Sequence, residues 1–307
     1  QIPIILGMQQ IKIWLSAARI RTLPLSVSGI LVGNAFCLNQ PNFSWSLFIL
    51  MLLTAISFQI ISNFANDYGD GIKGTDNENR IGPKRVLQQG LLSREVLKNG
   101  IIVMSIVALF LAFILIFLAF GSQSLFYGAV FLGLAVLSVW AAISYTTGDK
   151  AYGYKGLGDL FVLLFFGGVS VLGSYFVQLK TFSLPVILLA LAIGLFCVGV
   201  LNLNNMRDQI NDEAMGKKTM VVFLGAKGAK LYHLILMSIA MLVIGWVFLF
   251  ESYTFFWIPF LALIPLFLHL ITVIRNSDPK QLDPELKKVA LSTFLLSLLI
   301  FITLYIG

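Results

Sequence analysis

Two segments of the chain carry acidic and amide side chains at spacings that suit a metal site. The first holds Asn63, Asn66, Asp67 and Asp70, which share one face if the segment is helical. Carboxylate and amide oxygens are the hard ligands that Mg²⁺ prefers, and Mg²⁺ usually completes its shell with water and substrate phosphate. The spacing therefore indicates a divalent cation or an anionic ligand, although a helix end followed by a solvated loop explains one such segment equally well.

The second segment repeats this pattern, with Asn204, Asp208 and Asp212 spaced four residues apart. In both segments an Asn precedes the first Asp by four residues, and a Gly follows the second Asp by four. Both segments also lie where a long apolar run ends. Two copies at corresponding positions favour a shared function over two unrelated helix ends.

The composition is that of a membrane protein. Hydrophobic residues make up 58% of the 307 residues and charged residues 11%, and the mean hydropathy is +0.92. Soluble domains carry roughly 25% charged residues. A bilayer span takes about 20 apolar residues, so we expect an all-α polytopic membrane bundle of about nine transmembrane helices around a central cavity. The predicted spans cover about residues 12–37, 45–67, 99–120, 124–146, 158–178, 184–206, 229–250, 254–274 and 286–306.

The basic residues are unevenly distributed between the loops. If the N-terminus is cytoplasmic, the cytoplasmic parts hold nearly all Lys and Arg residues, and Lys180 alone lies on the opposite side. The positive-inside rule then places the N-terminus, both acidic segments and the mouth of the cavity at the cytoplasmic face. The net charge of +7 reflects this topology, and we see no nucleic-acid-binding motif.

Residues 8–307 are expected to form a single integral-membrane domain. Residues 1–7 are interpreted as an N-terminal extension or an expression remnant, and no removable signal peptide is expected. Cys37 and Cys197 lie inside apolar runs without metal-type spacing, which indicates packed thiols. His233 and His269 are isolated in the sequence and are interpreted as packing residues.

Carboxylates are costly in a membrane helix, at about 2.5–3.5 kcal/mol for one Asp at mid-bilayer. Grouped carboxylates also repel one another, so we expect divalent cations that share an anionic substrate. Basic residues on loops of the same face, notably Arg85 and Lys150, suit a diphosphate. A polyprenyl diphosphate joins such a head to an apolar tail, and its ionisation depends on stabilising the departing diphosphate.

At these positions the chain resembles the UbiA superfamily of membrane prenyltransferases. The resemblance rests on Asn63-x3-Asp67-x2-Asp70 and Asn204-x3-Asp208-x3-Asp212, and it extends from Arg21-Thr-Leu-Pro24 to about Gly225. Within the superfamily, the stretch from Asn66 through Arg80-Ile-Gly-Pro83 is most similar to enzymes that prenylate 1,4-dihydroxy-2-naphthoate in bacterial menaquinone biosynthesis.

The resemblance implies a Mg-dependent transferase in the bacterial cytoplasmic (inner) membrane, surrounded by membrane lipids. It implies transfer of a polyprenyl group from its diphosphate to 1,4-dihydroxy-2-naphthoate, with loss of CO₂ and formation of demethylmenaquinone. The implied catalytic residues and metal ligands are Asp67, Asp70, Asp208 and Asp212. The implied diphosphate-binding residues are Arg85, Lys150 and Lys217. Further substrate contacts are implied for Asn63, Asn66, Tyr145 and Asn204, with Asn63 and Asn204 assisting the metal ligands.

One motif departs from the family pattern. The family's Tyr-x3-Lys reads here Tyr145-x3-Asp149, with Lys150 one position late, so the roles of Tyr145 and Lys150 stay open. Asp159 is left outside the predicted site.

Two alternative functions are retained. The first is prenylation of another aromatic acceptor, namely 4-hydroxybenzoate, homogentisate or haem. The second is a cation-coupled transporter. The transporter is disfavoured because both acidic segments lie at one membrane face and no broken helix pair recurs in inverted halves.

Overall fold

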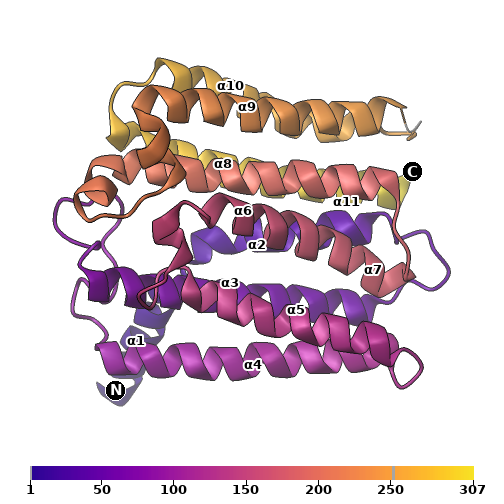
Figure 1. Cartoon of the computed structure of the whole chain (residues 1–307). Helices are drawn as coiled ribbons and strands as arrows, with labels where there is room; N and C mark the ends of the chain where they lie inside the picture. Colours follow the sequence, from indigo (N-terminus) through magenta and orange to yellow (C-terminus); the bar gives the residue numbers. More distant parts are fainter. Residues whose placement is uncertain (1, 251–252) are drawn as a thin grey trace.

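The computed structural model describes residues 2–250 and 253–307, most of which are helical (Figure 1). Nine helical segments in this part of the chain are long and apolar enough to cross a membrane. The predicted all-α fold with about nine spans is therefore confirmed. In chain order the elements are α1 (Ile2–Ala18), η1 (Ile20–Thr22), α2 (Leu23–Ala35), α3 (Trp45–Lys73), α4 (Arg94–Phe120), α5 (Leu125–Ser144), η2 (Tyr152–Lys155), α6 (Gly158–Val162), η3 (Leu163–Gly173), α7 (Ser174–Leu179), α8 (Leu184–Ala214), α9 (Met220–Phe250), η4 (Ile258–Ala262), α10 (Leu263–Arg275), η5 (Pro279–Gln281) and α11 (Leu282–Ile306).

The outer surface of the bundle carries large apolar side chains. Phe110, Phe117 and Leu242 are 62%, 63% and 72% exposed. Such exposure is unfavourable in water and favourable against lipid tails, and helices satisfy their own backbone hydrogen bonds as a bilayer requires. The protein is an integral membrane protein.

The two helices that carry the acidic segments belong to different packing clusters. The central helix α8 packs against α9, α11 and η3, with Leu189, Ile193 and Phe196 fully buried. Helix α3 packs against α1 and α4 through a second cluster that includes Ile61 and Leu97. The two helices are joined by the cavity between them, which residues of both line.

Helices α3 and α8 continue beyond the predicted ends of their spans at residues 67 and 206. Helix α3 ends at Lys73, where Gly74 adopts a positive φ of 74° as the C-cap. Helix α8 ends at Ala214. The predicted ends lie where hydropathy falls, because polar side chains begin there. The helices continue past these points because their backbone hydrogen bonds do not depend on the polarity of the side chains. The acidic residues of both segments consequently lie on helices, at one end of the bundle, on the left in Figure 1.

The first predicted span is interrupted at Arg19. Its left-handed backbone, with φ 50° and ψ 62°, separates α1 from η1, and Pro24 lies in the first turn of α2. A left-handed conformation costs about 1–2 kcal/mol in a residue with a Cβ atom. Such local strain concentrates at functional sites, and here it directs the Arg19 guanidinium toward α3, as described below.

Segment η3 is a π-helix that packs very closely on α8. A Cβ atom on Gly167 would lie 2.4 Å from the carbonyl oxygen of Ala190 and 3.1 Å from the Cα atom of Gly194. Only glycine permits this approach. π-Helical turns are rare in proteins, but those that occur are often found at functional sites. The close packing of η3 on α8 therefore marks this region as a candidate part of the functional site.

A buried polar chain joins the last three long helices. The Nε2 atoms of His233 on α9 and His269 on α10 lie 2.8 Å apart, and His269 Nδ1 lies 2.5 Å from Glu285 Oε2 on α11. Lys288 Nζ donates to Glu285 Oε1 at 2.5 Å. Both histidines are fully buried, so the interpretation of them as packing residues is refined: they link helices through hydrogen bonds.

We predict that Glu285→Ala lowers the free energy of unfolding in detergent by about 3 kcal/mol, because His269 and Lys288 lose their shared buried partner. Glu285→Gln should cost less, since its carbonyl oxygen still accepts a hydrogen bond from His269. Thermal unfolding of the purified variants measures both effects. The exposed Lys287→Ala substitution is the control, and a Glu285→Ala protein as stable as this control would contradict the prediction.

Candidate active site

The ends of α3 and α8 meet through the segment that follows α3. Asn211 Nδ2 on α8 donates a hydrogen bond to the carbonyl oxygen of Thr75 at 2.9 Å. The backbone N–H of Gly82 donates to Asp208 Oδ1 at 3.3 Å. The two acidic segments, far apart in sequence, are therefore neighbours in the structure.

A cavity of about 380 Å³ lies between these helix ends. Its lining includes Asn66 and Asp70 from α3, and Asn204, Asp208 and Asp212 from α8. Each set is spaced by four residues and so forms one helical face. The repeat that faces the cavity on α3 is thus Asn66-x3-Asp70, three residues further along the helix than the Asn63-x3-Asp67 spacing noted in the sequence.

Asn63 and Asp67 are turned toward the N-terminal segment. Asn63 Nδ2 donates to the carbonyl oxygen of Ala18 at 2.8 Å and to Thr22 Oγ1 at 3.1 Å. Asp67 Oδ1 lies 2.5 Å from Arg19 Nη2. These contacts hold the break between α1 and α2 against α3.

Arginine and lysine side chains lie between the carboxylates. Arg85 Nη1 lies 2.9 Å from Asp67 Oδ1, and Arg80 Nε lies 3.3 Å from Asp76 Oδ1 and 3.4 Å from Asp208 Oδ2. The guanidinium of Arg80 therefore bridges the two acidic segments. Every one of these side chains is largely buried, so the pairs are weakly screened by solvent.

Arg207 fixes Asp208 from the opposite side. Its Nε and Nη2 atoms donate to Asp208 at 3.0 and 2.6 Å, and its Nη1 lies 2.5 Å from Asp283 on α11. Asn204 Oδ1 accepts a further hydrogen bond from Arg207 at 2.9 Å. The N-terminus of α11 thereby helps to hold the second acidic segment.

The segment of residues 74–93, which we call the strap, covers both acidic segments. It supplies Asp76, Arg80, Gly82 and Arg85, whose contacts are given above. A Cβ atom on Gly82 would lie 2.4 Å from Arg207 Nη2 and 2.7 Å from Arg80 Nη2. The strap is therefore held against both acidic segments, and Arg85 contacts Asp67 of the first one.

Lys217 is the cation at the far side of the cavity. Its Nζ lies 3.6 Å from Asp70 Oδ2 and 3.9 Å from Asp212 Oδ1. Burial alone lowers the pKa of Lys217, but the charges of Asp70 and Asp212 outweigh it and raise the pKa above its ordinary value. The ammonium group therefore stays protonated and available to an anion.

Tyr154 also contacts the first acidic segment, although it was not among the site residues predicted from the sequence. Its hydroxyl donates to Asp70 Oδ1 at 2.8 Å and lies 2.5 Å from Thr75 Oγ1. Burial, followed by the charge of Asp70, raises the pKa of Tyr154. Tyr154 is thus a neutral hydrogen-bond donor to the carboxylate.

The two residues of the shifted family motif lie in different environments. Tyr145 lines the cavity, and burial raises the pKa of its hydroxyl, which therefore stays protonated. Lys150 is exposed and does not line the cavity. Among the residues that the structure describes, the lysine that meets the carboxylates is Lys217.

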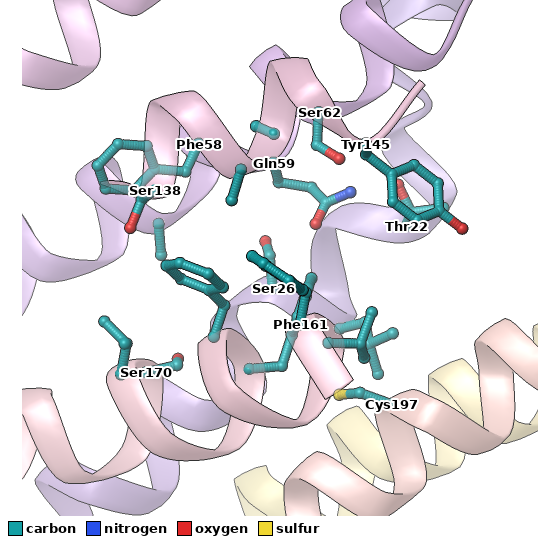
Figure 2. A pocket seen from close by; sticks show the side chains of 18 of the residues that line it. Thr22, Ser26, Phe58, Gln59, Ser62, Ser138, Tyr145, Phe161, Ser170 and Cys197 are labelled. Atoms are coloured by element: carbon teal, nitrogen blue, oxygen red, sulfur yellow. The ribbon is translucent and has the colours of Figure 1, made fainter. Parts of the chain in front are cut away.

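Below the ionic end, the cavity is largely apolar. Figure 2 shows Phe58 and Phe161 facing it, together with small side chains such as Ser138 and Ser170. Deeper residues include Met51, Leu115, Ile116 and Phe131. A charged head and a hydrocarbon tail can therefore be accommodated by one continuous space.

The donor set fits a divalent cation, because buried carboxylate oxygens lack partners. Within residues 2–250 and 253–307, Asp76 Oδ2 and Asp212 Oδ2 are buried and accept no hydrogen bond, a situation that costs about 1–3 kcal/mol for each group. Asp76 Oδ1 accepts no hydrogen bond either, and it meets Arg80 only as an ion pair. Burial, followed by the charge of Asp70, raises the pKa of Asp76 to about 7. In this geometry, no three acidic, His or Cys side chains of the described residues converge on one point, because Arg and Lys groups lie between them.

Arg19, Asp76, Arg80 and Tyr154 were outside the set predicted from the sequence. Arg19 and Arg80 both line the cavity, and the signal for Arg80 was its place in the Arg80-Ile-Gly-Pro83 stretch. Asp76 is the next acidic residue after Asp67 and Asp70 in the sequence, and it lies six positions after Asp70. Because the chain leaves the helix at Gly74, helical spacing could not place it.

The fold and the site define a polytopic helical membrane protein with an ion-paired, two-helix acidic site above an apolar cavity. Residues 26–302 match the model of the UbiA prenyltransferase family, and the chain belongs to that family. It is 39% identical to the 1,4-dihydroxy-2-naphthoate octaprenyltransferase of Haemophilus influenzae, over 97% of each chain. It is 38% identical to the enzyme of the same name from Escherichia coli K12, over 96% of this chain and 95% of the other.

A solved structure supports the fold. A UbiA homologue from Archaeoglobus fulgidus, determined with DMAPP and Mg²⁺, aligns with a TM-score of 0.66 over 96% of this chain and 99% of its own. The two sequences are 16% identical, so this likeness concerns the arrangement of helices.

We predict that Gly82→Ala lowers the rate of prenyl transfer about ten-fold, because the added methyl group displaces Arg207 and Arg80 and weakens a hydrogen bond to Asp208. Steady-state turnover of the purified protein measures this effect. Gly133→Ala is the matched control, since a Cβ atom there meets open space. Equal rates for the two variants would show that the strap does not depend on this close approach.

Proposed function

We propose that the protein transfers a polyprenyl group from polyprenyl diphosphate to 1,4-dihydroxy-2-naphthoate, with loss of CO₂, in a Mg²⁺-dependent reaction of menaquinone biosynthesis. The observation that carries the proposal is a single cavity with an ionic end and an apolar body. The relatives named above, which match over nearly the full chain, support the choice of acceptor.

The balance of charge supports a metal-bound diphosphate rather than a free one. The ion pairs of the two acidic segments and the strap involve as many basic residues as acidic ones. This count leaves aside Asp283, which is more exposed. A diphosphate alone would add several uncompensated negative charges to this buried region, which is strongly unfavourable. A diphosphate accompanied by divalent cations adds little net charge.

The residues proposed to hold Mg²⁺ are the predicted ligands Asp70, Asp208 and Asp212, which line the cavity, together with Asp76. The predicted ligand Asp67 is paired with Arg19 and Arg85, and it is proposed to join them when Arg85 turns to the diphosphate. Bound Mg²⁺ would neutralise the negative charge of the diphosphate as it leaves. Asn66 and Asn204 line the cavity beside these carboxylates, so they are proposed to contact the metal-bound head, as is Tyr145. Asn63 is proposed to act from behind this face, through its contacts with α1 and Thr22.

The basic residues are proposed to change partners when the diphosphate binds. Lys217, Arg85 and Arg80 each pair with a carboxylate that we assign to the metal. Once a cation takes over that carboxylate, the same ammonium or guanidinium group can turn to a phosphate oxygen at little cost. Arg207 keeps its second partner, Asp283, so it is proposed to remain in place and orient Asp208.

The setting of the reaction is also proposed. We infer that residues 8–307 form one domain in the bacterial inner membrane, that lipids surround it, and that the N-terminus and active site face the cytoplasm. The positive-inside distribution of the basic residues supports this orientation.

We predict that purified protein in detergent converts a polyprenyl diphosphate and 1,4-dihydroxy-2-naphthoate to demethylmenaquinone and CO₂ in the presence of Mg²⁺. Mass spectrometry of the product should show complete loss after EDTA treatment and recovery after Mg²⁺ is restored. Asp208→Ala should be folded and inactive, because it removes a predicted ligand. Prenylation of 4-hydroxybenzoate instead would change the acceptor, and transfer to no acceptor would contradict the proposal.

We predict that Lys217→Gln raises KM for the polyprenyl diphosphate about ten- to hundred-fold, the range expected for a lost charge-assisted hydrogen bond. Lys150→Gln, which tests the assignment implied by the family resemblance, should change KM less than about two-fold because an exposed pair contributes little. Lys155→Gln is an exposed control. A larger effect at Lys150 than at Lys217 would reverse our assignment of the diphosphate-binding lysine.

A further inference from the structure

Gln59 is a polar side chain in the middle of the apolar part of α3. It lines the cavity, and Figure 2 shows its amide projecting into the space between Thr22, Tyr145 and Ser26. A membrane helix does not retain such a group without a partner, because an unsatisfied amide is costly in an apolar environment. In the sequence, Gln59 is marked only by its place four residues before Asn63.

The orientation of the Gln59 amide is fixed by its neighbours. Asn63 Nδ2 must face the carbonyl oxygen of Ala18, which can only accept a hydrogen bond. Asn63 Oδ1 is therefore the atom that faces Gln59, and it receives a hydrogen bond from Gln59 Nε2 at 3.2 Å. These two hydrogen bonds fix the orientation of the Gln59 amide, so that its acceptor atom, Oε1, faces the cavity.

Gln59 Oε1 needs a donor, and in the part of the chain that the structure describes no side chain donates to it. The two proposed substrates differ in this respect. The diphosphate head and hydrocarbon tail of the prenyl substrate offer no hydrogen-bond donor at neutral pH. A dihydroxy aromatic acid offers phenolic hydroxyl groups.

We propose that Gln59 is a substrate-binding residue for the aromatic acceptor, whose phenolic hydroxyl donates a hydrogen bond to Gln59 Oε1. This inference rests on the proposed function and adds a specificity-determining contact to it. Asn63 is then a positioning residue, because it selects which end of the Gln59 amide faces the ring.

The location of Gln59 suits an aromatic ring beside the reacting head. Asn63, to which Gln59 is bonded, also accepts a hydrogen bond at its backbone oxygen from Arg19 Nη2 at 3.3 Å. Arg19 in turn contacts Asp67 of the ionic end. Gln59 therefore lies at the boundary between the ionic end and the apolar body, where the prenyl carbon and the ring must meet.

The test compares Gln59→Leu and wild-type protein with two acceptors, 1,4-dihydroxy-2-naphthoate and an analogue that lacks one hydroxyl group. Removal of the recognised hydroxyl should raise the dissociation constant of the acceptor for the wild type about ten-fold, and Gln59→Leu should show the same loss of affinity with the full acceptor. The variant should be insensitive to that hydroxyl, since the two changes remove one interaction. KM for the polyprenyl diphosphate should stay unchanged.

Gln59→Met, which keeps the length of the side chain, provides a second variant, and the exposed Gln123→Leu is the matched control. Additive losses, or a shift confined to KM for the polyprenyl diphosphate, would overturn the inference. Anaerobic binding titrations of both acceptors, without turnover, separate the two levels of the proposal. Wild-type protein that binds the acceptor through Gln59 but forms no product would contradict the proposed reaction alone, whereas equal affinity of wild type and Gln59→Leu would contradict the role of Gln59 alone.

Discussion

Alternating carboxylate and cationic side chains at one end of the bundle hold α3, α8 and the strap in place. An isolated carboxylate is unfavourable at this depth, and so is an isolated guanidinium group. Arg80, which bridges Asp76 and Asp208, and Lys217, which lies between Asp70 and Asp212, make each charge the partner of another. Buried pairs of this kind add little net stability compared with apolar packing, but the loss of one partner is costly. This makes the arrangement specific: every member depends on the others.

A stable bundle can contain a site whose basic side chains change partners, because the stability of the fold comes from elsewhere. The apolar clusters around α8 and α3 supply the stability of the fold, so the ionic end does not have to. The positions of the polar groups are fixed by neighbours that are not among the proposed metal ligands. Asp283 fixes Arg207, and Ala18 and Thr22 fix Asn63. Pre-organised charges of this kind stabilise a departing anion without reorganisation during the reaction.

The apolar body of the cavity has a different physical basis. Its walls come from helices α2 to α8 and from η3, and the close contact of Gly167 with α8 positions the π-helical segment that forms one side. The few polar groups in this wall are therefore informative. Most of them are hydroxyl groups that bond to their own helix, such as Ser138 to Leu134, whereas Gln59 is bonded through only one end of its amide.

The sequence alone determined the membrane class, the number of spans and the two acidic segments, because hydropathy and helical spacing are local properties that tertiary contacts do not change. Arg85, which the sequence favoured as a diphosphate-binding residue, lies against Asp67 in the structure, and its role toward the diphosphate stays a prediction. The tertiary structure decided which members of each segment face the cavity: the helical phase of α3 turns Asn66 and Asp70 inward and directs Asn63 and Asp67 toward α1. It also decided that Lys217 and Tyr154, rather than Lys150, meet the carboxylates. Those pairings join residues far apart in the chain, and they follow from how the helix ends and connecting loops pack, which spacing along the sequence does not encode.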